Sequence, residues 1–127
     1  MSEPLILVAE DERDIRELIV ITLEFNGFNV VDVTNGEEAV AKALEISPDL
    51  ILMDVRMPKM TGFEACQALK ANDKTKDIPV VFLSAKGQEN EVNTGLDLGA
   101  AGYFLKPFAP DELGDRVNKV LAQYSKL

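Results

Sequence analysis

Polar side chains of complementary chemistry follow or end several apolar runs of this sequence. Three of them are carboxylates, because Glu10 and Asp11 follow one apolar run and Asp54 follows another. The hydroxyl of Ser84 and the ammonium group of Lys106 stand at the ends of two further runs. Carboxylates that come together repel one another unless a cation lies between them. A hydroxyl and an ammonium group beside such a cation would suit the oxygens of a phosphoryl group.

The available ligands narrow the choice of cation. The sequence has no histidine and a single cysteine, Cys66, which excludes a zinc cage of nitrogen and sulfur ligands, an internal disulfide and a cysteine–histidine nucleophile. Mg²⁺ prefers oxygen ligands and is usually held by one or two carboxylates together with water and phosphate. With Lys106 and Mg²⁺ neutralising a phosphoryl group and Ser84 donating a hydrogen bond to it, Asp54 could attack phosphorus, since carboxylates form aspartyl phosphates.

Each of these residues also has an ordinary structural role. An Asp or Ser directly after a strand often caps the following helix. A single lysine such as Lys106 is more often a solvated surface residue. Capping does not explain a lysine at the end of the fifth run, however, and the combination of residues therefore favours a site.

Two hydrophobic periodicities alternate along the chain and predict the elements that must bring these side chains together. Short apolar runs are typical of strands buried on both faces of a sheet, and one more mixed run is typical of an edge strand. The predicted strands are residues 5–9, the mixed run 28–33, and residues 50–53, 80–83 and 101–105. Stripes of apolar residues at helical spacing follow each strand, over residues 15–23, 40–44, 61–69, 92–96 and 113–124.

This alternation predicts an α/β fold of the (βα)5 kind, in which a five-stranded parallel sheet is doubly wound with helices on both faces. Local signals agree with the helix boundaries, because Asn35 with Glu38 and Thr61 with Glu64 are capping patterns and Gly27 suits the end of the first helix. Ligands bind to such sheets beyond the carboxyl ends of the strands, which is where the polar side chains described above would gather.

Length and composition describe a single domain over residues 1–127. Hydrophobic residues make up 46% and charged residues 28% of the chain, as in ordinary globular proteins. The net charge of −9 predicts that the protein does not bind nucleic acid or anionic membranes directly. No apolar run approaches the ~18 residues of a membrane span, and the first residues do not read as a secretory signal, so we expect a cytoplasmic protein.

Five runs of the sequence, in order, resemble the receiver domain of two-component response regulators, of the single-domain type found among chemotaxis regulators. These runs are residues 7–12, 52–58, 61–62, 82–85 and 103–108. The resemblance covers essentially the whole chain. It implies a flavodoxin-like fold with the strand order 2-1-3-4-5, which hydrophobic periodicity alone does not establish.

The resemblance also implies a role for each site residue. Asp54 would be the phosphoacceptor, which takes a phosphoryl group from the phosphohistidine of a partner histidine kinase or phosphotransfer protein. Mg²⁺ would be bound directly by Asp11, Asp54 and the backbone carbonyl of Arg56, and through water by Glu10. Lys106 would contact the phosphoryl group. No other cofactor is expected, and no enzymatic activity beyond the protein's own phosphotransfer and dephosphorylation.

A switch pair is implied by the same family. Ser84 would move toward the phosphoryl group, and the ring of Tyr103 would turn inward behind it. This change would alter the surface formed by the fourth helix, the fifth strand and the fifth helix, and with it the binding of a downstream protein partner. The oligomeric state stays open, with a dimer formed on phosphorylation as one alternative.

Three other functions are considered. A degenerate receiver that only binds partners is the main alternative, because Glu10 stands where Asp is commoner in the family. A phosphohydrolase similar to the haloacid dehalogenases would carry a second Asp two residues after the nucleophile, and Arg56 occupies that position. A flavodoxin-like FMN site is disfavoured because the acidic loop over residues 10–14 would repel a phosphate.

Overall fold

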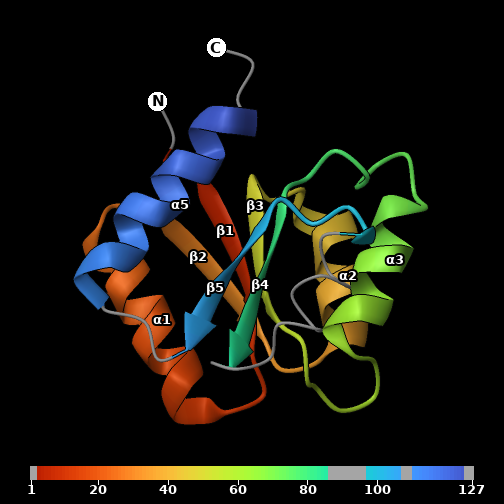
Figure 1. Cartoon of the computed structure of the whole chain (residues 1–127), viewed down its shortest axis with the longest axis horizontal. Coiled ribbons are helices and arrows are strands. Elements are labelled where there is room, and N and C mark those ends of the chain that lie inside the picture. The colour runs from red at the N-terminus through yellow and green to blue at the C-terminus, as the bar shows by residue number, and fades with distance from the viewer. Residues whose placement is uncertain (1–2, 86–96, 107–109, 125–127) are drawn as a thin grey trace.

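Five parallel strands form one sheet in this computed structural model, which describes residues 3–85, 97–106 and 110–124, with the backbone alone at residues 84, 85, 105, 106 and 110. The sheet has the order β2-β1-β3-β4-β5, so that β1 and β3 are central neighbours and β2 is an edge strand (Figure 1). The strands are β1 (Leu5–Ala9), β2 (Asn29–Val33), β3 (Leu50–Asp54), β4 (Val80–Ala85) and β5 (Gly102–Lys106).

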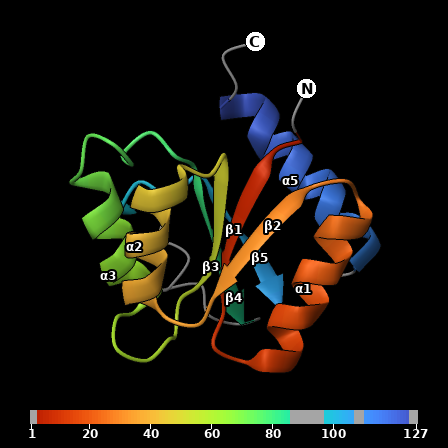
Figure 2. The same cartoon turned by 180° about the vertical axis from the view of Figure 1, so that it is seen from behind.

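Helices cover both faces of this sheet. The helices of the described residues are α1 (Arg13–Phe25), α2 (Gly36–Ile46), α3 (Gly62–Lys70) and α5 (Pro110–Tyr124). Helices α1 and α5 lie against one face and α2 and α3 against the other, as the two opposite views show (Figure 1, Figure 2). All strands point the same way, so their carboxyl ends share one edge of the sheet.

The core consists of two apolar layers, because successive strand residues face opposite sides of the sheet. On β1, Leu7 and Ala9 belong to the layer that includes residues of α2 and α3. Ile6 and Val8 belong to the layer that includes residues of α1 and α5. All five residues of β3 are buried, as expected of a central strand with helices on both faces.

Capping residues define the helix ends as predicted. The side chain of Asn35 accepts a hydrogen bond from the backbone N–H of Glu38 at the start of α2, at 2.9 Å. At the start of α3, Thr61 Oγ1 accepts from the N–H of Glu64 and the Glu64 carboxylate accepts from the N–H of Thr61, at 3.2 and 2.9 Å. Gly27 follows α1 with a φ of +93°, a left-handed conformation that glycine adopts without strain.

A pH-dependent part of the stability is expected at the start of α2. One carboxylate oxygen of Glu38 accepts hydrogen bonds from the backbone N–H and the hydroxyl of Thr34, both at 2.9 Å. The backbone hydrogen bond first, and the hydroxyl second, lower the pKa of Glu38 below its ordinary value of 4.5. Because the folded protein has the lower pKa, this stabilisation is present above pH 4.5 and is lost as the pH falls through the folded-state pKa.

The substitution Glu38→Gln measures this contribution. Urea denaturation should find the wild-type protein more stable than the variant at pH 7, with a difference that shrinks as the pH falls below the ordinary pKa of 4.5. Glu37→Gln is the control, because Glu37 is an exposed neighbour in the same helical turn. A difference that stays constant from pH 7 to strong acid would show that the carboxylate charge of Glu38 does not matter.

The predicted elements are confirmed wherever the structure describes them. All five strands form, and their observed order is the one that the family resemblance implied. The predicted helix over residues 92–96 lies outside the described residues. None of the helices in the described part of the chain combines the length and the apolar character needed to cross a bilayer.

Candidate metal centre

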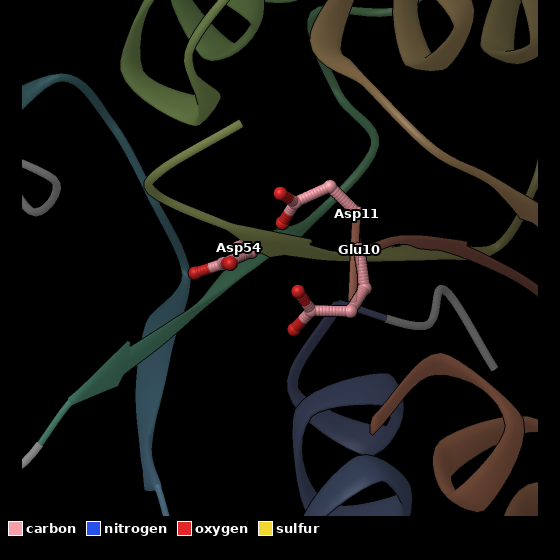
Figure 3. Close-up of side chains that lie close together, drawn as sticks. All are labelled: Glu10, Asp11 and Asp54. Atoms are coloured by element: carbon pink, nitrogen blue, oxygen red, sulfur yellow. The ribbon is translucent and has the colours of Figure 1, made fainter. Parts of the chain in front are cut away.

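Three carboxylates meet at the carboxyl edge of the sheet, between its two central strands. Glu10 and Asp11 directly follow β1, and Asp54 is the last residue of β3. Because Ala9 pairs with Met53 across these strands, the residues that follow are also neighbours. One carboxylate oxygen from each of the three acids lies within 4.8 Å of the others, and the three carboxyl groups turn to the same side of the sheet edge (Figure 3).

The three acids differ in their exposure to water. Glu10 is fully buried and Asp54 is 7% exposed, whereas Asp11 is exposed. Bringing these carboxylates together at a partly buried position costs free energy that a bound cation would offset. A donor set made only of carboxylate oxygens fits the preference of Mg²⁺, and the exposed Asp11 leaves the cluster open to solvent.

The backbone on both sides of Glu10 is held by hydrogen bonds. The N–H of Glu10 donates to the carbonyl of Val33 on β2 at 3.1 Å. The Glu10 carboxylate accepts from the N–H of Glu12 at 3.3 Å, which bends the loop back toward the sheet. The sheet hydrogen bonds therefore extend one residue beyond β1 and fix the backbone that carries Glu10.

The loop after Asp54 is packed closely against the strand end. Val55 and Met57 are buried, while the side chain of Arg56 is exposed. The N–H of Gly62, the first residue of α3, donates to the carbonyl of Val55 at 2.8 Å. This contact fixes the distance between α3 and the strand end, and with it the path of the backbone that carries Arg56.

Ser84 and Lys106 lie at the same edge of the sheet, Ser84 on β4 next to β3 and Lys106 on β5 next to β4. Asp54 pairs with Leu83, so the backbone of Ser84 is one residue beyond the partner of Asp54. Ala85 pairs with Lys106, which is the last residue of β5. The side chains of Ser84 and Lys106 lie outside the described part, so the structure brings together their backbones and does not test the contacts predicted for them.

Tyr103 lies on β5 and is 38% exposed. Its neighbour Phe104 points to the opposite face, where it is buried against α5. The guanidinium carbon of Arg116 lies 4.6 Å from the centre of the Phe104 ring. The ring of Tyr103 therefore projects from the sheet on the side away from α5.

One residue with a direct connection to this edge escaped the sequence analysis. Arg16 of α1 donates hydrogen bonds to the carbonyl oxygens of Glu10 and Asp11. The only signal in the sequence is an arginine within the first turns of the helix that follows the acidic pair. Such a position does not reveal whether the side chain turns to the loop or to solvent.

A second group of ionisable residues lies on α3, away from the carboxylates. Burial raises the pKa of the Cys66 thiol and lowers the pKa of Lys70. The ammonium of Lys70 donates to the carbonyl oxygens of Lys76 and Ile78, at 3.0 and 2.9 Å. Cys66 is a buried member of the core, and the two hydrogen bonds of Lys70 hold the turn after α3 in place.

Comparison with known proteins places this geometry in context. The family model described as response regulator receiver domain matches residues 6–118. The phosphate regulon transcriptional regulatory protein PhoB of Escherichia coli is 43% identical over 122 residues, which are 96% of this chain and 53% of that protein. The DNA-binding dual master transcriptional regulator RpaA of Synechocystis is 38% identical over 98% of this chain and 52% of that protein.

Solved structures give the same family. The chemotaxis response regulator CheY4 of Vibrio cholerae superposes with a TM-score of 0.88 at 33% identity, over 94% of this chain and 99% of that one. The receiver domain of the sensor histidine kinase PA1611 of Pseudomonas aeruginosa, solved with a magnesium ion in its active site cleft, has a TM-score of 0.88 at 28% identity, over 95% and 99% of the two chains.

These relatives correct one prediction. The net charge of −9 predicts no direct binding to nucleic acid, so that only protein partners are expected. The expectation is wrong, because the chain spans about half the length of the curated relatives it matches, which are transcriptional regulators and include one named as DNA-binding. The charge of 127 residues describes only the surface that they form, and it says nothing of the charge of the further residues in these longer relatives.

Proposed function

Because this chain belongs to the response regulator receiver domain family, we propose that it is a signalling switch in which Asp54 accepts a phosphoryl group from a partner histidine kinase or phosphotransfer protein. The observation that carries the proposal is the meeting of Glu10, Asp11 and Asp54 at the carboxyl edge of the sheet, with one oxygen of each within 4.8 Å of the others. As a receiver the chain is a signalling protein, and its chemistry concerns only its own phosphorylation.

The proposal assigns the metal ligands by position in the family pattern. Asp11 and Asp54 hold Mg²⁺ through carboxylate oxygens, the backbone carbonyl of Arg56 is a third ligand, and Glu10 acts through water. When bound, Mg²⁺ neutralises negative charge on the phosphoryl oxygens. The all-oxygen donor set and the exposed position of Asp11 support this assignment.

The transfer itself is a substitution at phosphorus. A carboxylate oxygen of Asp54 forms a bond to phosphorus, the bond from phosphorus to the donor's imidazole nitrogen breaks, and the electron pair leaves with that nitrogen. Lys106 places its positive charge, and Ser84 its hydroxyl, against two of the phosphoryl oxygens. The backbone of Ser84 directly follows Leu83, the partner of Asp54, and Lys106 pairs with Ala85 at the same end of the sheet, which supports these roles.

The response to phosphorylation is proposed at Ser84 and Tyr103. Movement of the Ser84 hydroxyl toward the phosphoryl group leaves room into which the ring of Tyr103 turns, which changes partner binding at the surface formed by the fourth helix expected from the sequence, β5 and α5. The outward position of Tyr103 supports this proposal. The names of the relatives favour control of transcription as the output, and a cytoplasmic location belongs to the same proposal.

Incubation with acetyl phosphate tests the proposed function. With Mg²⁺ present, intact mass measurement should find an adduct of one phosphoryl group on the wild-type protein, and EDTA should prevent its formation. No adduct in either condition would contradict the switch and support a module that only binds partners. An adduct that forms equally well in EDTA would contradict the proposed metal site.

A further inference from the structure

Arg16 connects three points around the acidic cluster. Its Nη1 donates to the carbonyl oxygen of Glu10 at 3.0 Å and to that of Asp11 at 3.5 Å. Its Nε donates to Oδ2 of Asp32 on β2 at 3.0 Å. The Arg16 side chain as a whole is 16% exposed, whereas that of its partner Asp32 is 45% exposed. One side chain therefore joins α1, the loop after β1 and the edge strand β2.

These contacts hold the peptide groups on both sides of Asp11. The carbonyl of Glu10 belongs to the peptide that precedes Asp11, and the carbonyl of Asp11 belongs to the peptide that follows it. The N–H of Glu10 is in turn held by the carbonyl of Val33 on β2, so the backbone has a partner at each peptide from the end of β1 to the start of α1. Fixing both peptides sets the direction in which the Asp11 side chain leaves the backbone.

We propose that Arg16 is a positioning residue for the metal site: through the carbonyls of Glu10 and Asp11 it holds the Asp11 carboxylate in the direction needed to bind Mg²⁺ together with Asp54. The inference rests on the proposed function, because it takes the three acids as the Mg²⁺ site. Asp32 has a supporting part, since it holds the guanidinium in the plane from which Nη1 reaches the loop.

The charge of Arg16 and its hydrogen bonds have opposite expected effects on Mg²⁺ affinity. A guanidinium close to the cluster repels a divalent cation, so electrostatics alone predicts that removing it strengthens Mg²⁺ binding. Loss of the positioning contacts predicts that removing it weakens Mg²⁺ binding. The sign of the change in affinity therefore separates the two effects.

Lysine and arginine also differ at this position. The planar guanidinium reaches the loop carbonyls and Asp32 at the same time, with Nη1 on one side and Nε on the other. The single ammonium of a lysine keeps the charge but does not have two nitrogens fixed in one plane. A lysine should therefore fail to restore Mg²⁺ affinity if positioning is the role of Arg16.

The test is a calorimetric titration with Mg²⁺ alone, which measures binding without any phosphoryl donor. Arg16→Met and Arg16→Lys should each weaken Mg²⁺ binding about 10-fold, the size of effect typical of residues that orient metal ligands. Arg13→Met is the matched control: it removes the same charge from the same helix, and Arg13 is 78% exposed and pairs with Glu17. The control should bind Mg²⁺ like the wild-type protein.

Asp32→Asn is a second variant for the case in which Arg16→Met does not fold. It keeps the guanidinium of Arg16 and weakens the contact between Arg16 Nε and residue 32. It should therefore weaken Mg²⁺ binding by a smaller factor than the substitutions of Arg16. Thermal unfolding without Mg²⁺ accompanies each titration, so that affinity is compared only among folded proteins.

Two results would overturn the inference. Folded Arg16→Met that binds Mg²⁺ as tightly as the wild-type protein, or more tightly, would show that the contacts do not position Asp11. Arg16→Lys with wild-type affinity would show that the simultaneous contacts of Nη1 and Nε are not required for Mg²⁺ binding. Asp11→Asn separates failure of this inference from failure of the proposed function. If Asp11→Asn leaves Mg²⁺ binding unchanged, the proposed metal site is wrong. If Asp11→Asn weakens Mg²⁺ binding but the Arg16 variants do not, only the inference about Arg16 fails.

Discussion

Asp54→Asn is expected to lose all phosphorylation by acetyl phosphate, to the detection limit of intact mass measurement. Asparagine has nearly the shape of aspartate and suits the same position at the end of β3, where the side chain is 7% exposed. Its amide carries no negative charge, so it neither attacks phosphorus nor binds Mg²⁺ as a carboxylate does. The loss should therefore occur without loss of the fold.

Asp49→Asn is the control for this substitution. Asp49 precedes β3 at the opposite end of the same strand, where its carboxylate accepts a hydrogen bond from the N–H of Leu5 at 2.8 Å. An asparagine oxygen can accept the same hydrogen bond. This variant should be phosphorylated like the wild-type protein, and an equal loss in both variants would mean that the effect is a general one on the fold.

Gly62→Ala is expected to lower the free energy of unfolding by about 2–3 kcal/mol. A Cβ atom at this position would lie 2.3 Å from the carbonyl oxygen of Asp54 and 3.1 Å from the Cα of Val55. Both are backbone atoms of the strand end, so neither gives way as a flexible side chain would. The start of α3 must shift, and the shift moves the backbone of Asp54, so Mg²⁺ affinity should also fall.

The sign of the stability change in Gly62→Ala distinguishes a steric clash from helix propensity. Alanine is a better helix former than glycine by about 0.5–1 kcal/mol, so helix propensity alone predicts that Gly62→Ala stabilises the protein. Gly102→Ala is the control, because a Cβ at Gly102 meets nothing within 4 Å. Urea denaturation should find a change of about 0.5 kcal/mol or less there. A stabilised Gly62→Ala would contradict the close contact between α3 and the end of β3.

Much of the fold was accessible from hydrophobic pattern and capping residues. The fully apolar segment of β3 predicted a buried central strand, and Thr61 with Glu64 predicted the start of α3, because both signals are local. The order of the strands is not local. Periodicity tells which residues are buried and not which strand lies beside which, so the order 2-1-3-4-5 came from the family resemblance and was then observed.

Part of the candidate site could likewise be predicted from the sequence. The meeting of Glu10, Asp11 and Asp54 followed from one rule, that the carboxyl ends of parallel strands share an edge. The contacts of Arg16 could not be predicted, because they depend on the path of the loop over residues 10–12. The net charge misled about nucleic acid, because it describes only the surface of these 127 residues, whereas the transcriptional regulators that the chain matches are about twice as long.

Identification of the phosphorylated residue tests the central claim most directly. The protein is treated with acetyl phosphate and Mg²⁺, reduced with borohydride, which converts an aspartyl phosphate to homoserine, and analysed by peptide mass spectrometry. The account predicts homoserine in place of Asp54 and an unmodified Asp11. Reduction at Asp11 with Asp54 intact, or no reduced residue in a sample that carries the phosphoryl adduct, would contradict it.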